Sequence, residues 1–192
     1  MTTGGSDNIL KWIAIVSIGV VVLFVGWFVY NESTKSGAQP KSDAKIASTA
    51  KKIADLGRTH VEVGEKVKYN SNPPTSGPHY ADWKKNDIYT DPQQDEYLVH
   101  SLEHGYVIMS YNCDAKLKDG SKIDCDTLKK QLGDLFKEKG AQKLIVVPRP
   151  SLDVPLALTA WTYIDKMDRF EKDRIVAFID AFRDKGPEQT ME

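Results

Sequence analysis

The stretch that most constrains this chain is residues 12–30, WIAIVSIGVVVLFVGWFVY, which holds no charged side chain. A helix needs about 20 consecutive apolar residues to cross the hydrocarbon core of a bilayer. Trp12, Trp27 and Tyr30 lie near the ends of the stretch, where amphipathic rings favour the membrane interface. A cleavable signal peptide would have a shorter apolar core and a small-residue cleavage site, and neither is evident. We therefore expect an uncleaved signal anchor.

This anchor sets the domain organisation of the chain. We expect a short N-terminal tail at residues 1–11, a transmembrane signal anchor at 12–30, a polar linker at 31–44 and a single compact domain at 45–190. Lys35, Lys41 and Lys45 follow the anchor, and counted alone they would favour a cytoplasmic C-terminal side. Large domains cross the membrane largely regardless of such charges, so the orientation depends on other features.

The two cysteines decide the expected orientation. Cys113 and Cys125 flank a polar, turn-rich segment. A disulfide that closes so short a loop stabilises a fold by about 3 kcal/mol in the chain-entropy model. Disulfides persist outside the reducing cytosol. We expect this disulfide and a domain outside the cytoplasm of a single-pass cell-membrane protein, the alternative being two unrelated buried thiols.

The charge balance excludes one class of partner. The chain has 26 Lys and Arg against 27 Asp and Glu, mixed along its length. A protein that binds nucleic acid non-specifically needs a basic surface. We therefore expect no nucleic-acid partner. The expected partners are the membrane and an unidentified protein of the cell envelope.

Apolar periodicity predicts an α+β domain with a short mixed or antiparallel sheet and flanking helices. Pro and Gly separate its short elements. We expect helices at residues 44–56, 126–139 (capped by Asp124 or Asp126) and 168–185, a strand or hairpin at 60–69, and strands at 106–111, 143–147 and 156–164.

The segment LVHSLEHG carries His100 and His104 with Glu103 between them. On a helix, residues four apart share one face, with their Cβ atoms about 5–6 Å apart. On a strand the same residues would lie about 13 Å apart. A shared metal ion therefore requires a helical turn at residues 100–104, and Gly105 is its expected end.

A third histidine, His79, follows the proline-rich loop NPPTSGP, which restricts its position. We expect a transition-metal site built on His79, His100 and His104, with His60 and Met109 as further candidate ligands and Glu103 orienting a histidine by a hydrogen bond. Three histidines and a water suit zinc, whereas a His/Met set favours copper. The alternatives are that His79 bonds its own loop, that His60 is an exposed strand residue and that Met109 is core.

Residues 100–104 also fit the H-x-x-E-H pattern of inverted zinc peptidases, in which the glutamate activates water. That mechanism needs a distal third ligand, for which Glu171 and Glu188 are candidates. The domain is small for a peptidase, and Gly105 would end the helix directly after His104. We therefore expect a non-catalytic domain, with a small zinc hydrolase as the less favoured hypothesis.

Four motifs occur in a specific order: NPPTSGPHY, VHSLEHG before an apolar strand, ALTAWTY after a proline-rich turn, and a helix ending at Lys185, Gly186 and Pro187. In this order the chain resembles the family known as domain of unknown function 3105, over roughly residues 45–190. Members of that family are typically anchored by one N-terminal membrane helix. The resemblance implies an anchored domain and no established activity.

Two hypotheses therefore lead. In the first, the membrane-anchored extracytoplasmic domain binds copper or zinc through its histidines, to buffer, deliver or sense the metal or to use it structurally. In the second, the domain is a scaffold or interaction module of the cell envelope whose histidines only fix structure. The first requires that the histidine side chains converge on one point, since metal–nitrogen bonds are about 2.0–2.1 Å long.

Overall fold

A computed structural model describes residues 49–117 and 119–190 of the chain. The expected tail, signal anchor and linker, residues 1–44, lie outside these ranges. Within the ranges, no helix has both the length and the apolar character that a membrane crossing requires.

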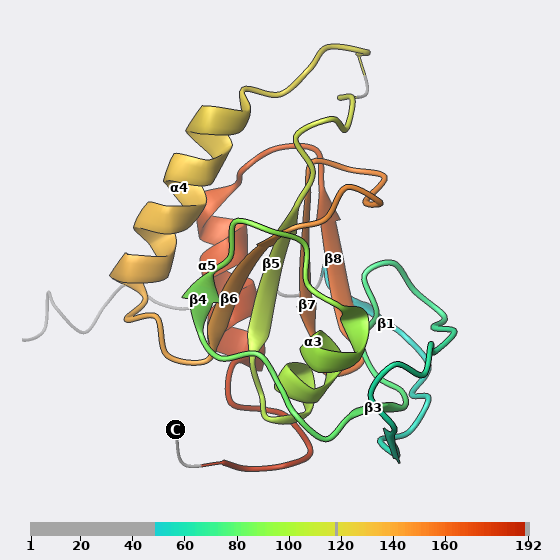
Figure 1. Cartoon of the computed structure of the whole chain (residues 1–192). Helices are drawn as coiled ribbons and strands as arrows, with labels where there is room; N and C mark the ends of the chain where they lie inside the picture. Colours follow the sequence, from blue (N-terminus) through green and yellow to red (C-terminus); the bar gives the residue numbers. More distant parts are fainter. Residues whose placement is uncertain (1–48, 118, 191–192) are drawn as a thin grey trace, which may run out of the picture. The chain divides into compact units, whose positions relative to one another are not determined.

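The domain is built on a six-stranded mixed sheet with the strand order β1-β8-β7-β5-β6-β4 (Figure 1). Its strands are β1 (Lys51–Lys52), β4 (Asp87–Ile88), β5 (Val107–Tyr111), β6 (Leu144–Pro148), β7 (Leu156–Ala160) and β8 (Tyr163–Met167). Strands β4, β6 and β5 are parallel, whereas β7, β8 and β1 each run antiparallel to their neighbours. The predicted α+β class with a mixed sheet is confirmed.

Helices cover both faces of this sheet (Figure 1). They are α3 (Asp95–Glu103), α4 (Cys125–Glu138) and α5 (Lys172–Phe182). Because side chains alternate along a strand, β5 contributes to two apolar cores. Ile108 packs with Leu98 and Leu102 of α3. Val107 and Met109 belong to the opposite core, which α4 and α5 cover.

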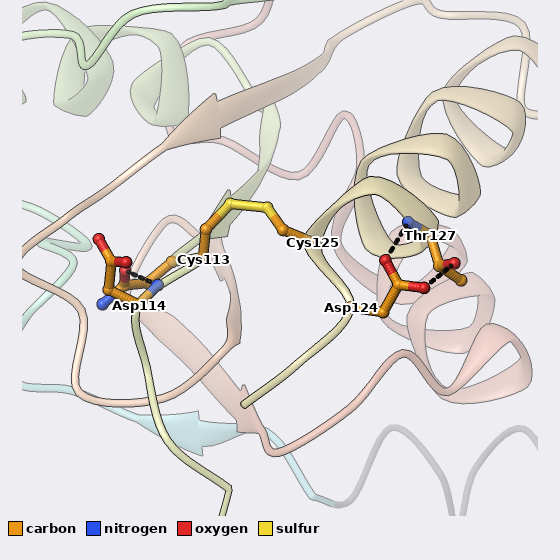
Figure 2. The surroundings of a disulfide bond; sticks show 6 residues. Cys113, Asp114, Asp124, Cys125 and Thr127 are labelled. Atoms are coloured by element: carbon orange, nitrogen blue, oxygen red, sulfur yellow. Dashed lines mark hydrogen bonds between the residues drawn. A yellow bond between two sulfur atoms is a disulfide. The ribbon is translucent and has the colours of Figure 1, made fainter. Parts of the chain in front are cut away.

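Local signals predicted α4 to within one residue at each end. Its apolar face, Leu128, Leu132, Leu135 and Phe136, is buried as expected. The Asp124 side chain accepts a hydrogen bond from Thr127 N at 3.1 Å, which caps the helix. The expected disulfide is present and joins Cys113, just after β5, to Cys125, the first residue of α4 (Figure 2).

Four expected elements differ from the structure. The described part of the helix expected at 44–56 instead contains β1, and Ile53 N donates to Thr162 O at 2.8 Å; residues 44–48 lie outside the described ranges. The strand expected at 156–164 is the hairpin β7–β8, which turns at Thr162, where φ is 62°. Long-range pairing with β8 outweighs local helical spacing at β1.

The segment expected as a strand or hairpin at 60–69 forms only the short strand β2 (His60–Val61). It pairs in parallel with β3 (His79–Tyr80), so that His60 lies opposite His79. The last helix, α5, is also shorter than the expected 168–185. The β2–β3 pair matters most for function because it brings two distant histidines together.

Candidate metal centre

The helical turn that a shared ion requires is present at the end of α3. His104 is the C-terminal cap of α3, and its backbone N donates to His100 O at 3.1 Å. Acidic Asp95 and Glu96 in the first turn favour this helix through its dipole. Both histidine side chains are buried, and their Nε2 atoms lie 3.0 Å apart.

Gly105 ends α3 with a φ of 83°, a conformation that costs glycine nothing. A Cβ atom at this position would lie 2.8 Å from Asp184 Cα. The end of the helix is therefore in close backbone contact with the C-terminal segment of the chain, which also carries Glu188.

The proline-rich loop delivers His79 to the centre. Gly77 N donates to Gly57 O at 2.9 Å and His79 N to Thr59 O at 3.0 Å, which continue the β2–β3 pairing. His60 is exposed, and its ring centroid lies 5.1 Å from that of His79 and 5.1 Å from that of His100. The loop and the helix thus meet at a cluster of imidazole rings.

Backbone carbonyls fix the orientation of the two innermost rings. His79 Nδ1 lies 2.8 Å from Gly77 O, and His100 Nδ1 lies 2.7 Å from Tyr80 O. A carbonyl only accepts, so each Nδ1 carries a proton, and in the neutral ring Nε2 presents a lone pair. Metal-binding histidines are held in this way, with the second ring N–H bonded to a backbone carbonyl or a carboxylate.

Glu103 contacts the ligand nitrogen of a histidine and not the nitrogen that orients its ring. Its Oε2 is 2.8 Å from His79 Nε2, and its Oε1 is 3.6 Å from Arg58 Nη1. The carboxylate therefore meets the nitrogen that a metal would bind, while Gly77 and Tyr80 orient the rings. Glu103 is itself a candidate ligand, and Arg58 is a neighbour that sequence reasoning did not identify.

Burial lowers the pKa of His79, and nearby His100 and His60 act in the same direction. The Gly77 carbonyl and the Glu103 carboxylate oppose this change because both favour an imidazolium. The net lowering favours the neutral imidazole, which is the form that binds a metal ion.

Glu188 is the second acid at the centre, with its Oε2 3.8 Å from His104 Nε2. The C-terminal segment is held against the end of α3 by two backbone hydrogen bonds, from Asp184 N to Gly105 O at 2.8 Å and from Glu188 N to Glu103 O at 3.1 Å. The other distal acid considered from the sequence, Glu171, instead contacts Arg174 on α5.

The ligand atoms fall into two sets, within each of which all atoms lie within 4.8 Å of one another. The His60 set comprises His60, His79, His100 and Glu103, and the His104 set comprises His100, His104 and Glu188. Ligands on a tetrahedral zinc ion lie about 3.3 Å apart when its bonds are about 2.0–2.1 Å. The separations of 2.8 Å and 3.0 Å need small outward shifts and the 3.8 Å between His104 Nε2 and Glu188 Oε2 a small inward one, so either set could hold a metal ion.

The predicted ligands are thus distributed unequally. His100 belongs to both sets, His79 to the His60 set and His104 to the His104 set. His60, expected as a further candidate ligand, belongs to the His60 set. Met109 is fully buried in the core that α4 and α5 cover, on the face of β5 opposite to α3, and is part of neither set.

Trp83 forms one side of the centre, a role that its sequence position does not indicate. Its ring centroid lies 4.5 Å from that of His104 and 5.3 Å from that of His100. Lys85 Nζ lies 3.9 Å from the Trp83 ring centroid, which is a cation–π contact. An ion bound in the His104 set would therefore lie next to an indole, which makes Trp83 a fluorescent reporter.

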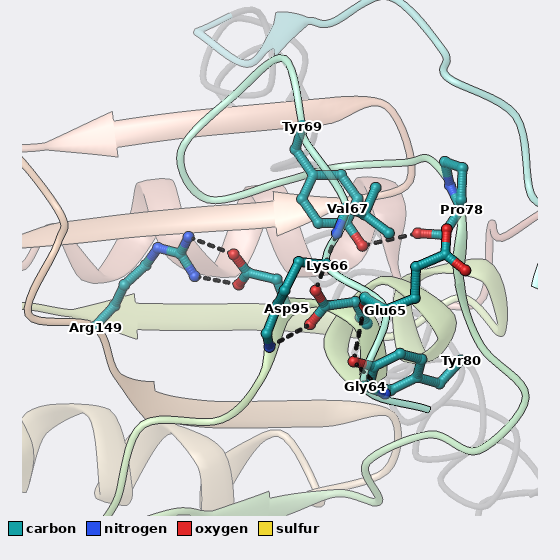
Figure 3. A network of polar contacts seen from close by, with 10 residues as sticks. Gly64, Glu65, Lys66, Val67, Tyr69, Pro78, Tyr80, Asp95 and Arg149 are labelled. Carbon is teal, nitrogen blue, oxygen red and sulfur yellow. Dashed lines mark hydrogen bonds and ion pairs between the residues drawn. The ribbon is translucent and has the colours of Figure 1, made fainter. Parts of the chain in front are cut away.

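A cavity of about 480 Å³ lies elsewhere, beside the first turn of α3. In it Arg149 binds both carboxylate oxygens of Asp95, and Tyr69 donates to Pro78 O at 2.8 Å (Figure 3). Neither this cavity nor those of about 450 and 230 Å³ is lined by a histidine. For the hydrolase hypothesis, Glu188 is thus in place as the distal acid, but none of these three cavities is a substrate cleft next to the histidines.

The comparisons with known proteins agree with the expected resemblance. Residues 60–192 match the family described as protein of unknown function (DUF3105). No curated protein and no solved structure is found to match the chain. The matched residues include every ligand of both sets and cover more than half of the chain. The chain therefore belongs to this family of unknown function.

Proposed function

We propose that this chain is a membrane-anchored extracytoplasmic protein whose domain binds one transition-metal ion, zinc or copper, through its histidines. One observation carries the proposal. Two buried histidines each use Nδ1–H to bind a backbone carbonyl, and so both direct Nε2 toward a carboxylate and further imidazoles. Backbone bonding of these rings supports metal binding because it leaves the ligand nitrogen open.

The contact between His79 and Glu103 also supports a bound cation. His79 Nε2 and Glu103 Oε2 are both buried, and neither has a hydrogen-bond partner among the residues that the structure describes. A neutral imidazole with its proton on Nδ1 offers Nε2 as an acceptor, and a carboxylate oxygen is also an acceptor. Two acceptors 2.8 Å apart need a positive charge between them, which either a second proton on the His79 ring or a metal ion would supply.

The donor atoms favour particular metals. Both sets contain only imidazole nitrogen and carboxylate oxygen. Among the described residues, the cysteines form a disulfide and both Met109 and Met167 are in the core, so neither a thiolate nor a thioether is offered. Imidazole suits zinc and copper, whereas soft sulfur ligands select Cu(I). The donor set therefore supports Zn²⁺ or Cu²⁺.

The proposed location rests on two features of the sequence. Residues 12–30 are uncharged and long enough to anchor the chain in a membrane. The disulfide between Cys113 and Cys125 suits an oxidising compartment. A protein of the cell envelope that supplies or accepts the ion is the partner that this function needs.

Metal content tests the proposal. The full chain is produced in an oxidising compartment, purified in detergent, loaded with Zn²⁺ or Cu²⁺ and desalted, and bound metal is counted by mass spectrometry. His100→Asn is the decisive variant, since the amide nitrogen of asparagine can replace Nδ1 as donor to Tyr80 O but offers no Nε2. We expect one ion in the wild type and none in this variant.

Glu171→Gln is the matched control, because it neutralises the acid that lies away from the histidines and should keep the ion. A folded wild-type chain that retains no metal refutes the proposal. That result would leave an envelope scaffold or interaction domain with structural histidines.

A further inference from the structure

We propose that the His60 set and the His104 set hold one ion in turn, with His100 as the ligand common to both. This inference rests on the proposed function and adds that the centre exchanges its ion between two positions. The domain would therefore deliver metal rather than store it.

His100 limits the centre to one ion bound through it. Its Nδ1 lies 2.7 Å from Tyr80 O, so only Nε2 has a lone pair to offer. Nevertheless His100 belongs to both sets, and its Nε2 lies 3.0 Å from His104 Nε2. His100 can contribute to either set, but not to two ions at once.

The remaining ligands cannot all join a single ion as they lie. Two nitrogens on the same ion lie at most about 4.2 Å apart, because each bond is about 2.0–2.1 Å long. His79 and His104 share neither set, although each shares one with His100. An ion bound beside His79 therefore leaves His104 and Glu188 uncoordinated, and an ion bound beside His104 leaves His79 uncoordinated.

The two positions are electrostatically alike. Each set has one carboxylate, Glu103 or Glu188, to offset the charge of the ion. The carboxylate of Glu103 is also 3.6 Å from Arg58, which weakens its attraction for a cation, whereas Glu188 is half-exposed and solvated. Neither set has a clear advantage in charge, which favours comparable occupancy of the two.

Solvent reaches the centre at each set through a different ligand. His60 is exposed in one set, and the Glu188 side chain is 51% exposed in the other. His79, Glu103 and His104 are buried. An ion could enter at one exposed ligand, move by exchange of one ligand at a time while His100 stays bound, and leave at the other.

Copper titration with electron paramagnetic resonance tests this inference in the full chain. His60→Asn/His79→Asn disables one set, and His104→Asn/Glu188→Gln disables the other. If both positions are comparably occupied, the loss of one lowers affinity only about two-fold. We expect each double variant to keep one Cu²⁺ with less than about a ten-fold loss of affinity.

The spectra identify the ligands. The His104/Glu188 variant should show coupling to three imidazole nitrogens and the His60/His79 variant to two, and the wild type should show the sum of both signals. His100→Asn should lower affinity more than about 100-fold, since even groups that only orient a ligand are worth about 10–100-fold. Arg58→Gln should shift the wild-type signal toward that of the three-imidazole form.

Three results would overturn the inference alone: two ions per wild-type chain, a wild-type spectrum identical to that of one double variant, or a double variant as weak as His100→Asn although it is folded by circular dichroism. The last would mean one composite site. A wild-type chain that binds no metal overturns the proposed function together with this inference, so the two failures are distinct.

Discussion

Gly186→Ala should detach the C-terminal segment from the end of α3. A Cβ atom on Gly186 would lie 2.1 Å from Glu103 O, 2.3 Å from Gly105 N and 2.8 Å from Glu103 C. All three atoms are backbone, so no side-chain rotation can relieve the contact. Gly186 is absent from the positions with positive φ, so its substitution by alanine is a test of space alone.

The cost follows from the contacts that the methyl group breaks. Overpacking typically costs about 1–3 kcal/mol. The segment avoids the clash by giving up the hydrogen bonds from Asp184 N and Glu188 N, each worth about 0.5–1.5 kcal/mol. Both routes give about 1–3 kcal/mol. For a domain near 150 residues this lowers Tm by about 2–4 °C per kcal/mol.

Thermal unfolding by circular dichroism and hydrogen exchange measure the two effects. The amides of Asp184 and Glu188 should lose protection in Gly186→Ala. Gly133→Ala in α4 is the matched control, since its Cβ would meet only Ile88 Cδ1 of β4 at 3.7 Å, an ordinary contact. We expect this control to stabilise the domain by about 0.5–1 kcal/mol. An unchanged Tm and unchanged protection in Gly186→Ala would refute the close approach.

Three further predictions concern regions away from the centre. Reduction of the Cys113–Cys125 disulfide should lower the unfolding free energy by about 3 kcal/mol in the chain-entropy model, measured by urea unfolding with and without reductant, and leave metal affinity unchanged. Arg149→Lys should cost about 1–3 kcal/mol, because lysine cannot bind both oxygens of Asp95, and urea unfolding measures this too. Burial raises the pKa of Tyr69 above its usual 10.0, so the unfolded state loses this proton first, and stability should fall as pH rises above 10; Tyr69→Phe should reduce that fall in alkaline unfolding curves.

Each of these has an outcome that contradicts it. If the reduced chain were as stable as the oxidised one, the disulfide would not stabilise the fold by constraining the unfolded chain. Lys130→Ala, which breaks an exposed pair with Asp134, is the control for Arg149→Lys and should change stability by less than about 0.5 kcal/mol. If Arg149→Lys and Lys130→Ala changed stability equally, the argument from the paired Asp95 oxygens would be refuted. If stability fell equally with alkaline pH in the wild type and in Tyr69→Phe, the argument from the Tyr69 pKa would be refuted.

Elements with local signals could be predicted from the sequence. The spacing of Leu128, Leu132 and Leu135 and the cap at Asp124 specify α4 without help from distant residues. The turn that places His100 next to His104 is likewise local, since residues four apart on a helix are neighbours.

Elements fixed by distant partners could not be predicted in this way. Around β1, Ala50 and Ile53 have helical spacing, yet the segment pairs with β8, and Thr162 O accepts the Ile53 amide. The apolar run at 156–164 gives no sign of a turn, but Thr162 N donates to Thr75 O at 2.9 Å and the chain reverses there. In both cases a hydrogen bond to a remote segment outweighs the local pattern.

The centre combines both kinds of information. Spacing brings His100 and His104 together, whereas His79 joins them through the contact of β3 with α3, and Glu188 through the backbone contacts of the C-terminal segment with the end of α3. The sequence offered Glu171 and Glu188 equally as distal acids. The difference between them is this backbone contact, which no side-chain pattern encodes.

This dependence on long-range contacts links metal affinity to the stability of the fold. The ligands come from residues 60, 79, 100–104 and 188, and a nine-residue helix such as α3 is too short to persist alone in water. The unfolded chain therefore lacks both sets. An ion that binds only the folded state stabilises it by about 2.7 kcal/mol at 100 times its Kd. A variant that disturbs only the docking of the C-terminal segment should thus weaken the His104 set and leave the His60 set, whose ligands do not come from that segment, able to stabilise the domain.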